Sequence, residues 1–145
     1  MLWENRVLIA ALTAWSLAQI LKVPIEFWRS HKWDWSLLFT AGGMPSSHSA
    51  LVTAAAHAIG LYEGFDSPLY ALSVVVTMIV VYDATGIRRQ AGRHAEMINA
   101  MMHDLMQGHP LQEQQLREML GHTPLQAFMG ILLGLTIAQI FTLFW

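Results

Sequence analysis

The chain has no cysteine and few charged residues, and both shortages limit what it can be. Without cysteine it can form neither disulfide bonds nor thiolate metal sites. Asp, Glu, Lys and Arg make up 12% of its 145 residues, whereas soluble domains carry about 25%. Hydrophobic residues make up 54%, and the mean hydropathy is +0.40. This length and composition favour a single-domain integral membrane protein over a soluble one.

Four apolar segments are predicted to be transmembrane helices, at about residues 2–21, 46–64, 68–87 and 124–145. The first lacks the basic start and the small-residue cleavage site of a signal peptide, so we expect it to be retained. The second approaches the roughly 20 residues that a bilayer requires only if it runs from Ser46 to Gly64. Pro24 should end the first helix or kink it.

A polar segment, residues 89–121, separates the third and fourth apolar segments. Helical periodicity places six of its apolar side chains on one face: Met97, Ile98, Met101, Met102, Leu105 and Met106. This pattern predicts an amphipathic helix at the membrane interface, followed by a short helix at Leu111–Leu120. The expected fold is an all-α integral membrane domain over residues 1–145, with about four transmembrane helices and an interfacial helical insertion.

The basic residues are distributed unevenly about these predicted spans. Four spans place both termini on one side of the membrane and the linkers 22–45 and 87–123 on the other. Those linkers hold all but one of the eight Lys and Arg residues, namely Lys22, Arg29, Lys32, Arg88, Arg89, Arg93 and Arg117. The positive-inside rule puts that face in the cytoplasm. We therefore expect a bacterial plasma membrane protein whose functional site faces the cytoplasm.

The stretch from Gly42 to Ser49 combines glycine, proline, hydroxyl groups and a histidine just before an apolar run. Ser46 or Ser47 is a suitable N-cap for the following helix. Backbone N–H groups at such a helix start form a natural anion site, and His48 can transfer a proton near neutral pH. The alternative is an ordinary capped helix start in which His48 is incidental.

Basic side chains on the same face are candidate phosphate ligands. Lys22 and Arg29 are seven residues apart, so they share a helix face if the helix continues past Pro24. Arg88 and Arg89 are expected to end the third span. Arginine matches phosphate oxygens with a planar fork, and lysine supplies a point charge. The alternative is that all of them are interfacial cations whose stems lie along the bilayer.

A second histidine, His122, directly precedes the fourth span. Gln126 follows one helical turn later, so its oxygen can accept an imidazole N–H and fix the tautomer. The alternative is that Thr123 and Gln126 form a capping box. Further along, Gly130 and Gly134 are spaced as in a close helix-packing face.

Two of these patterns match family motifs in order and spacing. Lys22-x6-Arg29 fits the motif K-x6-R-P, with Ser30 in place of the proline, and the run from Pro45 to His48 fits P-S-G-H. The sequence resembles the phosphatidic acid phosphatase type 2 superfamily, which includes the vanadium-dependent haloperoxidases. It is most similar to the small divergent branch of that superfamily.

The third family motif, S-R-x5-H-x3-D, departs from this pattern. Arg88 and His94 have the spacing of its first half, but Ile98 then occupies the acidic position. The second half fits better at His122 and Gln126. We therefore expect a motif split by the insertion 89–121, with His94 as the alternative nucleophile. Gln126 stands where the family has aspartate.

The resemblance implies a phosphate-binding set and a metal-independent reaction. The phosphate ligands would be Lys22, Arg29, Ser46, Ser47 and either Arg88 or Arg89. His122 would attack phosphorus to form a phosphohistidine, while His48 would protonate the leaving alcohol and then activate water. The implied function is a membrane lipid phosphatase acting on a lipid phosphate monoester or diphosphate. No metal or other cofactor is needed.

Other assignments stay open at this point. Asp83 would steer an arginine or a catalytic histidine, or simply pair with Arg88. The expected partners are a lipid phosphate and membrane lipids, with no nucleic acid, and a homodimer could supply packing that six-helix family members contain within one chain. The alternatives to a phosphatase are a non-catalytic lipid-phosphate binding or carrier protein and a metal-dependent hydrolase that uses histidines of the insertion.

Overall fold

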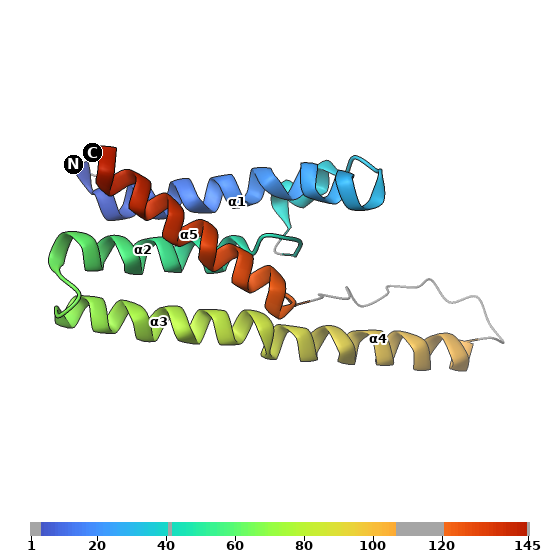
Figure 1. Ribbon diagram of the computed structural model, residues 1–145. Coiled ribbons are helices and arrows are strands. Elements are labelled where there is room, and N and C mark those ends of the chain that lie inside the picture. The colour runs from blue at the N-terminus through green and yellow to red at the C-terminus, as the bar shows by residue number, and fades with distance from the viewer. Residues whose placement is uncertain (1–3, 41, 107–120, 145) are drawn as a thin grey trace.

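The structure is a computed structural model that describes residues 4–40, 42–106 and 121–144. Its elements are α1 (Arg6–Ser30), the 3-10 helix η2 (Trp35–Phe39), α2 (Ser47–Glu63), α3 (Pro68–Thr85), α4 (Ile87–Met106) and α5 (Pro124–Phe144). No β-strand occurs in the described ranges, which confirms the predicted all-α fold. Figure 1 shows α1, α2, α3 and α5 side by side, with α4 continuing from α3 beyond the bundle.

Among the described residues, three helical segments are long and apolar enough to cross a membrane. They are Arg6–Ser30, Pro68–His103, which joins α3 to most of α4, and Pro124–Phe144. The predicted second span corresponds to α2, which has 17 residues. Its length of about 25 Å is less than the ~30 Å hydrocarbon core of a bilayer. This short helix packs against α1, α3 and α5, so protein rather than lipid surrounds most of it.

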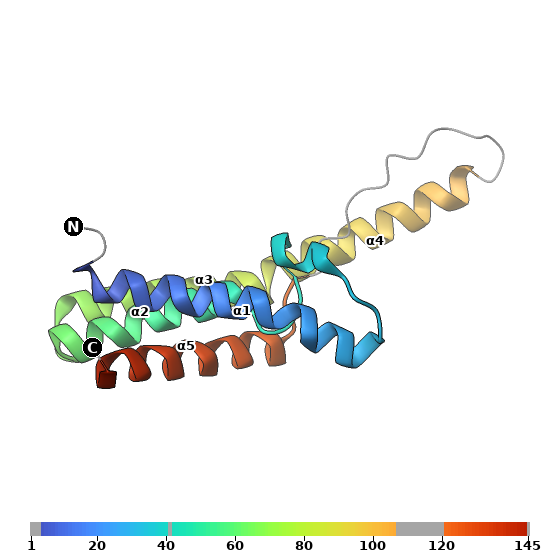
Figure 2. The ribbon, with the colours of Figure 1, turned by 90° about the horizontal axis from the view of Figure 1, so that it is seen from above.

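The first helix is longer than its sequence indicated. It was expected to end near Leu21, but α1 runs through Pro24 to Ser30. Proline is tolerated inside membrane helices because neighbouring groups can satisfy the carbonyl that it frees. His31 ends the helix in the left-handed conformation, and its N–H donates to the Phe27 carbonyl at 2.8 Å. The second half of α1, after Leu21, therefore extends beyond the N-terminal end of α2 (Figure 2).

The boundary after the third span also differs from the prediction. A turn at Gly86 separates α3 from α4, so Arg88 and Arg89 belong to the first turn of α4 rather than to the end of α3. Their side chains lie outside the described part of the structure, as do residues 107–120 with the predicted short helix. The apolar side chains of α4 are exposed, as in an amphipathic helix; they are Met97, Ile98, Met101, Met102 and Leu105.

Small residues form the core of the bundle around α2. The fully buried members are Ala10, Ala14, Ala18, Ala50, Ala54, Ala58 and Ala138. On α1 and on α2 they recur every fourth residue, so each helix presents one small face that lets backbones approach closely. By contrast, α3 directs most of its large apolar side chains outward, as a lipid-facing helix does.

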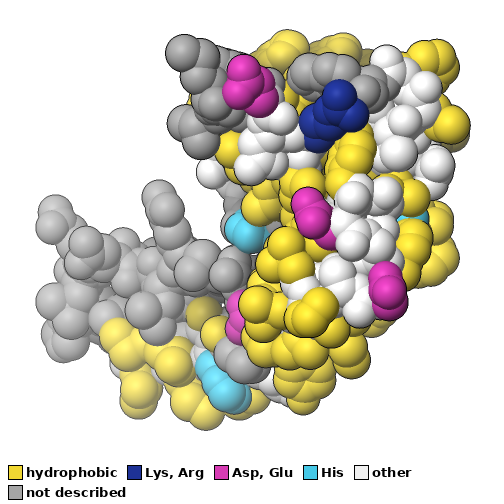
Figure 3. Space-filling view, turned by 90° about the vertical axis from the view of Figure 1, so that its left-hand side faces the viewer, with side chains coloured by type: hydrophobic (Ala, Val, Ile, Leu, Met, Phe, Trp, Pro, Cys, Tyr) yellow, Lys and Arg dark blue, Asp and Glu magenta, His cyan; other side chains and the backbone are white. Residues whose placement is uncertain are grey.

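The two ends of the bundle differ in what they carry. The start of α1 and the end of α5 lie at the same end of the bundle (Figure 1). The space-filling view of that end shows mostly apolar surface with scattered charged groups (Figure 3). Arg6, at the start of α1, has its Cζ 5.7 Å from the centre of the Tyr62 ring. At the opposite end, the second half of α1, the start of α2, the end of α3 and the start of α5 come together.

Candidate functional site

The first turn of α2 is held in place by a cap and by a contact to α5. Ser46 is the N-cap, which confirms one of the two predicted positions; its Oγ accepts hydrogen bonds from the N–H and the hydroxyl of Ser49, at 3.3 Å and 3.0 Å. The Ser46 N–H donates to the carbonyl of Gln126 at 3.0 Å. The hydroxyl and the N–H of Ser46 are therefore both used to hold the first turn of α2 in place.

Ser47, the first residue of α2, presents a different environment. It is fully buried, and its Oγ has no hydrogen-bond partner among the described residues. An unsatisfied buried hydroxyl costs about 1–3 kcal/mol, and a ligand at this turn that accepts its proton would remove that cost. Since the positive end of the α2 dipole lies at the same turn, an anion is the favoured type of ligand.

Lys22 brings a positive charge into the same region. Its side chain is 1% exposed, and its Nζ donates to the carbonyl of Thr40 at 2.9 Å. Gly43, with φ of 88°, lies against the lysine stem, because a Cβ there would be 3.5 Å from Lys22 Cδ. An ammonium group has three protons to donate, and within the described residues only one is used. A buried ammonium is costly without further compensation, which an anion would supply.

His122 reaches this end of the bundle through a backbone contact with α3. Its N–H donates to the carbonyl of Ala84 at 3.0 Å, and the residue is 4% exposed. This bond brings the start of α5 against the end of α3, which precedes it by almost forty positions. Asp83, half-buried, is the residue next to Ala84. The backbone thus places a histidine and a carboxylate at the junction of the two helices.

Gln126 makes both of the contacts that its spacing allowed. Its Oε1 accepts the Thr123 N–H at 2.9 Å, and the Thr123 hydroxyl accepts the Gln126 N–H at 3.3 Å, so the capping box is present. The same Oε1 lies 3.4 Å from Nδ1 of His122. The shorter distance belongs to the cap. Orientation of the imidazole is therefore the weaker of the two roles that the geometry gives to Gln126.

The packing glycines set the distance between α5 and the start of α2. A Cβ on Gly130 would lie 2.3 Å from the Ser46 carbonyl oxygen, and one on Gly134 would lie 2.6 Å from that of Ala50. These approaches confirm the predicted close packing face. Because Gly130 touches the cap residue itself, it controls how near α5 and His122 come to the first turn of α2.

The remaining predicted residues lie on three different helices. His48 is half-buried in the first turn of α2, beside Ser47. Arg29 is exposed in the last turn of α1, two turns beyond Lys22 on the same side, since the helix does continue past Pro24. His94 is exposed on α4, outside the bundle. Lys22, the first turn of α2 and His122 thus lie at the same end of the bundle, whereas His94 lies on α4, beyond that end.

Two features of the site carry no clear signal in the sequence. The Thr40 carbonyl that receives Lys22 is a backbone group, and any residue type would provide it. Gln19 fixes the same loop by donating to the Leu38 carbonyl at 3.1 Å.

Among the described residues, no three His, Asp or Glu side chains are grouped as metal ligands would be.

Within the described residues, three helices have membrane-spanning length. Together with the buried lysine, the N-terminus of α2 and His122, they define a helical membrane protein with a candidate anion site. The chain belongs to the Divergent PAP2 family, whose model matches residues 3–137. It is 39% identical over 155 aligned positions to the uncharacterized membrane protein YuiD of Bacillus subtilis (strain 168), covering 99% of this chain and 98% of that relative. No solved structure matches it. The family name agrees with a phosphatase-like protein, and the name of the relative agrees with a membrane protein.

Proposed function

We propose that the protein is a membrane lipid phosphatase that hydrolyses a lipid phosphate monoester or diphosphate through a phosphohistidine intermediate. The observation that carries this proposal is the buried ammonium of Lys22, with a single described hydrogen bond, at the end of the bundle where α2 begins and His122 is buried. A charge in such a place is functional by default in a membrane protein. A phosphate group would satisfy the lysine, the Ser47 hydroxyl and the helix dipole together.

In the proposed reaction, His122 is the nucleophile and His48 is the acid and base. His122 attacks phosphorus with Nε2, while Nδ1 faces Gln126, and the bond between phosphorus and the leaving oxygen breaks. His48 gives its proton to the leaving alcohol or phosphate and then takes a proton from the water that hydrolyses the phosphohistidine. Lys22 and Ser47 stabilise the charge on the non-bridging oxygens. Arg29 and an arginine at position 88 or 89 would act on the same charge.

The proposal includes a location. The reaction would take place at the cytoplasmic face of a bacterial plasma membrane, because all but one of the eight Lys and Arg residues lie in the segments assigned to that side. The lipid headgroup would meet the site at the bilayer boundary, and Asp83 would hold either a histidine or an arginine in position.

Phosphate release by the purified protein in lipid nanodiscs tests this function. The substrates are phosphatidic acid, phosphatidylglycerophosphate and a polyprenyl diphosphate, each with and without a chelator. We expect release that a chelator does not reduce, and loss of release in His122→Ala and in His48→Ala. A radiolabelled phosphate should be trapped on wild-type protein in a form stable to alkali and labile to acid, and should be absent from His122→Ala.

The matched control is His57→Ala. His57 lies on α2 as His48 does, but its Nε2 contacts Gln139 Oε1 at 3.2 Å, and its ring packs beside Phe65 near the opposite end of the helix. Turnover should be unchanged in this variant. Activity retained in both His48→Ala and His122→Ala would overturn the catalytic assignment, and activity lost only in His94→Ala would transfer the nucleophile to α4.

The contacts of Gln126 favour a second candidate function. An amide stands where the family has a carboxylate, and its oxygen lies nearer to the Thr123 N–H than to the imidazole. A neutral partner does not stabilise an imidazolium as a carboxylate does. The protein would then be a lipid-phosphate binding or carrier protein that keeps the anion site. Saturable binding of a lipid phosphate without turnover of any of the three substrates would establish this function instead.

A further inference from the structure

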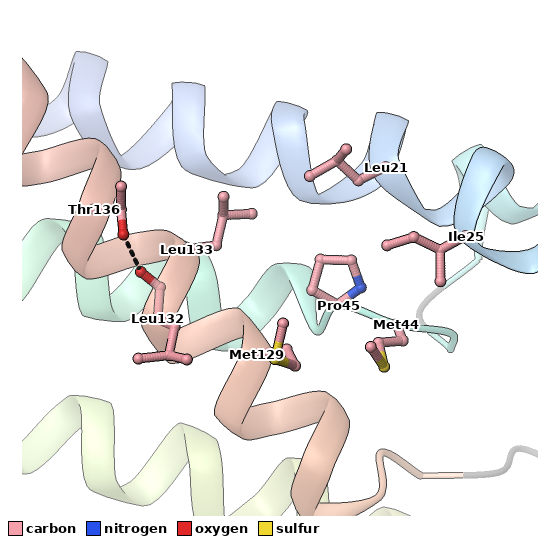
Figure 4. A pocket seen from close by; sticks show the side chains of 8 residues that line it. All are labelled: Leu21, Ile25, Met44, Pro45, Met129, Leu132, Leu133 and Thr136. Atoms are coloured by element: carbon pink, nitrogen blue, oxygen red, sulfur yellow. Dashed lines mark hydrogen bonds between the residues drawn. The ribbon is translucent and has the colours of Figure 1, made fainter.

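An apolar cleft opens beside the candidate phosphate site, between α1 and α5. Its volume is about 190 Å³, and its lining residues are Leu21, Ile25, Met44, Pro45, Met129, Leu132, Leu133 and Thr136. Figure 4 shows Leu21 and Ile25 descending from α1 toward the Met44–Pro45 segment, with the α5 side chains on the other side. Three separate parts of the chain therefore build one hydrophobic space.

One end of the cleft is lined by residues that are next in sequence to those of the anion site. Met44 and Pro45 directly precede Ser46, the cap of α2, and Leu21 directly precedes the buried Lys22. On α5, Met129 adjoins Gly130, which touches the Ser46 carbonyl. A molecule held by its phosphate at the start of α2 would have its next atoms at the mouth of this cleft.

The other end runs along α5, on the partly exposed side of that helix. From Met129 to Thr136 the lining follows α5 for seven residues, a rise of about 10 Å. The direction is away from the end where the site lies and toward the end where α1 begins and α5 ends (Figure 1). In a membrane, this is the direction from the headgroup region to the hydrocarbon core.

The lining is suited to hydrocarbon and to little else. Its one side-chain hydroxyl, on Thr136, donates to the Leu132 carbonyl at 2.8 Å, so the hydroxyl proton is already used (Figure 4). The volume is below the roughly 300–1,000 Å³ of pockets that enclose whole small molecules. Leu21, Met129 and Leu132 are 37%, 37% and 41% exposed. The cleft is therefore narrow and apolar, with apolar side chains at its open edge.

We infer that this cleft receives the first methylene groups of one hydrocarbon chain of the substrate lipid, which enters sideways from the bilayer between α1 and α5. This inference rests on the proposed function, because it takes the phosphate to be bound at the start of α2. It assigns substrate selection to the Met44–Pro45 segment and to the cleft-facing side of α5. Lipid phosphates with a hydrocarbon chain that fits there are favoured over phosphate esters without one.

Photo-crosslinking tests the position of the chain without requiring turnover. The probe is phosphatidic acid with a diazirine near the carboxyl end of one acyl chain, in nanodiscs of the wild-type protein. Peptide mapping should find adducts on Met44, Met129, Leu132 or Thr136. Adducts confined to the outer face of α3 would overturn the inference, and so would equal labelling of the cleft by a phosphatidylcholine probe, because the cleft would then hold any membrane lipid.

A pair of variants tests selection. Leu132→Trp fills the cleft, and Leu135→Trp adds the same bulk to a residue of α5 that is 37% exposed and does not line it. The cleft variant should lower kcat/KM for long-chain phosphatidic acid about tenfold and leave that for glycerol 3-phosphate unchanged, and the control should change neither. Equal effects of the two variants would refute the inference.

The two proposals fail in different ways. Absence of turnover by the wild-type protein, combined with adducts in the cleft, would reject the phosphatase and keep the chain site. Turnover of lipid phosphates, combined with adducts elsewhere, would reject the chain site and keep the phosphatase.

Discussion

Replacing Gly130 by alanine should move the start of α5, with His122, away from the first turn of α2. The added Cβ would lie 2.3 Å from the Ser46 carbonyl oxygen and 3.0 Å from Ser49 Cβ. Ordinary contact begins at 3.4 Å, so α5 must move away from α2 by about 1 Å. Overpacking of this kind costs about 1–3 kcal/mol of stability. A displacement of about 1 Å at a reacting group can lower the rate about a hundredfold.

The assay measures kcat for lipid phosphate hydrolysis together with the thermal midpoint, followed by tryptophan fluorescence. We expect Gly130→Ala to lower the midpoint and to reduce kcat about a hundredfold, because His122 moves with α5. The matched control is Gly42→Ala, since no described atom lies within 4 Å of a Cβ at Gly42. A Gly130→Ala protein with wild-type midpoint and wild-type kcat would refute the argument that this contact sets the spacing of the site.

Two further substitutions separate function from stability. Lys22→Met should weaken vanadate binding about ten- to hundredfold, since a hydrogen bond to a charged group contributes about 1.5–3 kcal/mol. The same variant should change the thermal midpoint little, because removing a buried charge offsets the loss of the hydrogen bond to the Thr40 carbonyl. Reduced stability with unchanged vanadate binding would assign Lys22 a structural role. Gln126→Glu should raise kcat about tenfold, because this isosteric change puts a carboxylate oxygen where Oε1 now lies 3.4 Å from Nδ1 of His122, and a carboxylate stabilises the imidazolium. Turnover no faster than wild type would mean that the capping contact to Thr123 governs this position.

Local patterns predicted the parts of the site that depend on neighbours in the sequence. Ser46 as an N-cap and the capping box of Thr123 and Gln126 each involve groups within one helical turn. The packing role of Gly130 and Gly134 followed from their spacing of four. These features could be predicted because short-range geometry is nearly the same in every α-helix.

The errors have equally physical causes. Pro24 predicts that the first helix ends or kinks, whereas α1 continues through it to Ser30, because neighbouring groups can satisfy the carbonyl that a proline frees. The start of α4 at Ile87 depends on the turn at Gly86, which an apolar-run argument does not detect. The small-residue core, in contrast, can be recognised in the sequence, because the buried alanines of α1 and of α2 are spaced four residues apart, as in a helix-packing face.

The sequence by itself determined the class of protein, the all-α architecture and the chemical identity of the candidate groups. Scarce charge and long apolar segments leave a chain few ways to satisfy its backbone other than as helices in a membrane. Three features were decided only by the tertiary structure. Lys22 is buried with its ammonium on the Thr40 carbonyl, the N–H of His122 donates to the Ala84 carbonyl, and an apolar cleft lies between α1 and α5. Those contacts join residues distant in sequence, and they depend on how closely small residues allow the helices to pack.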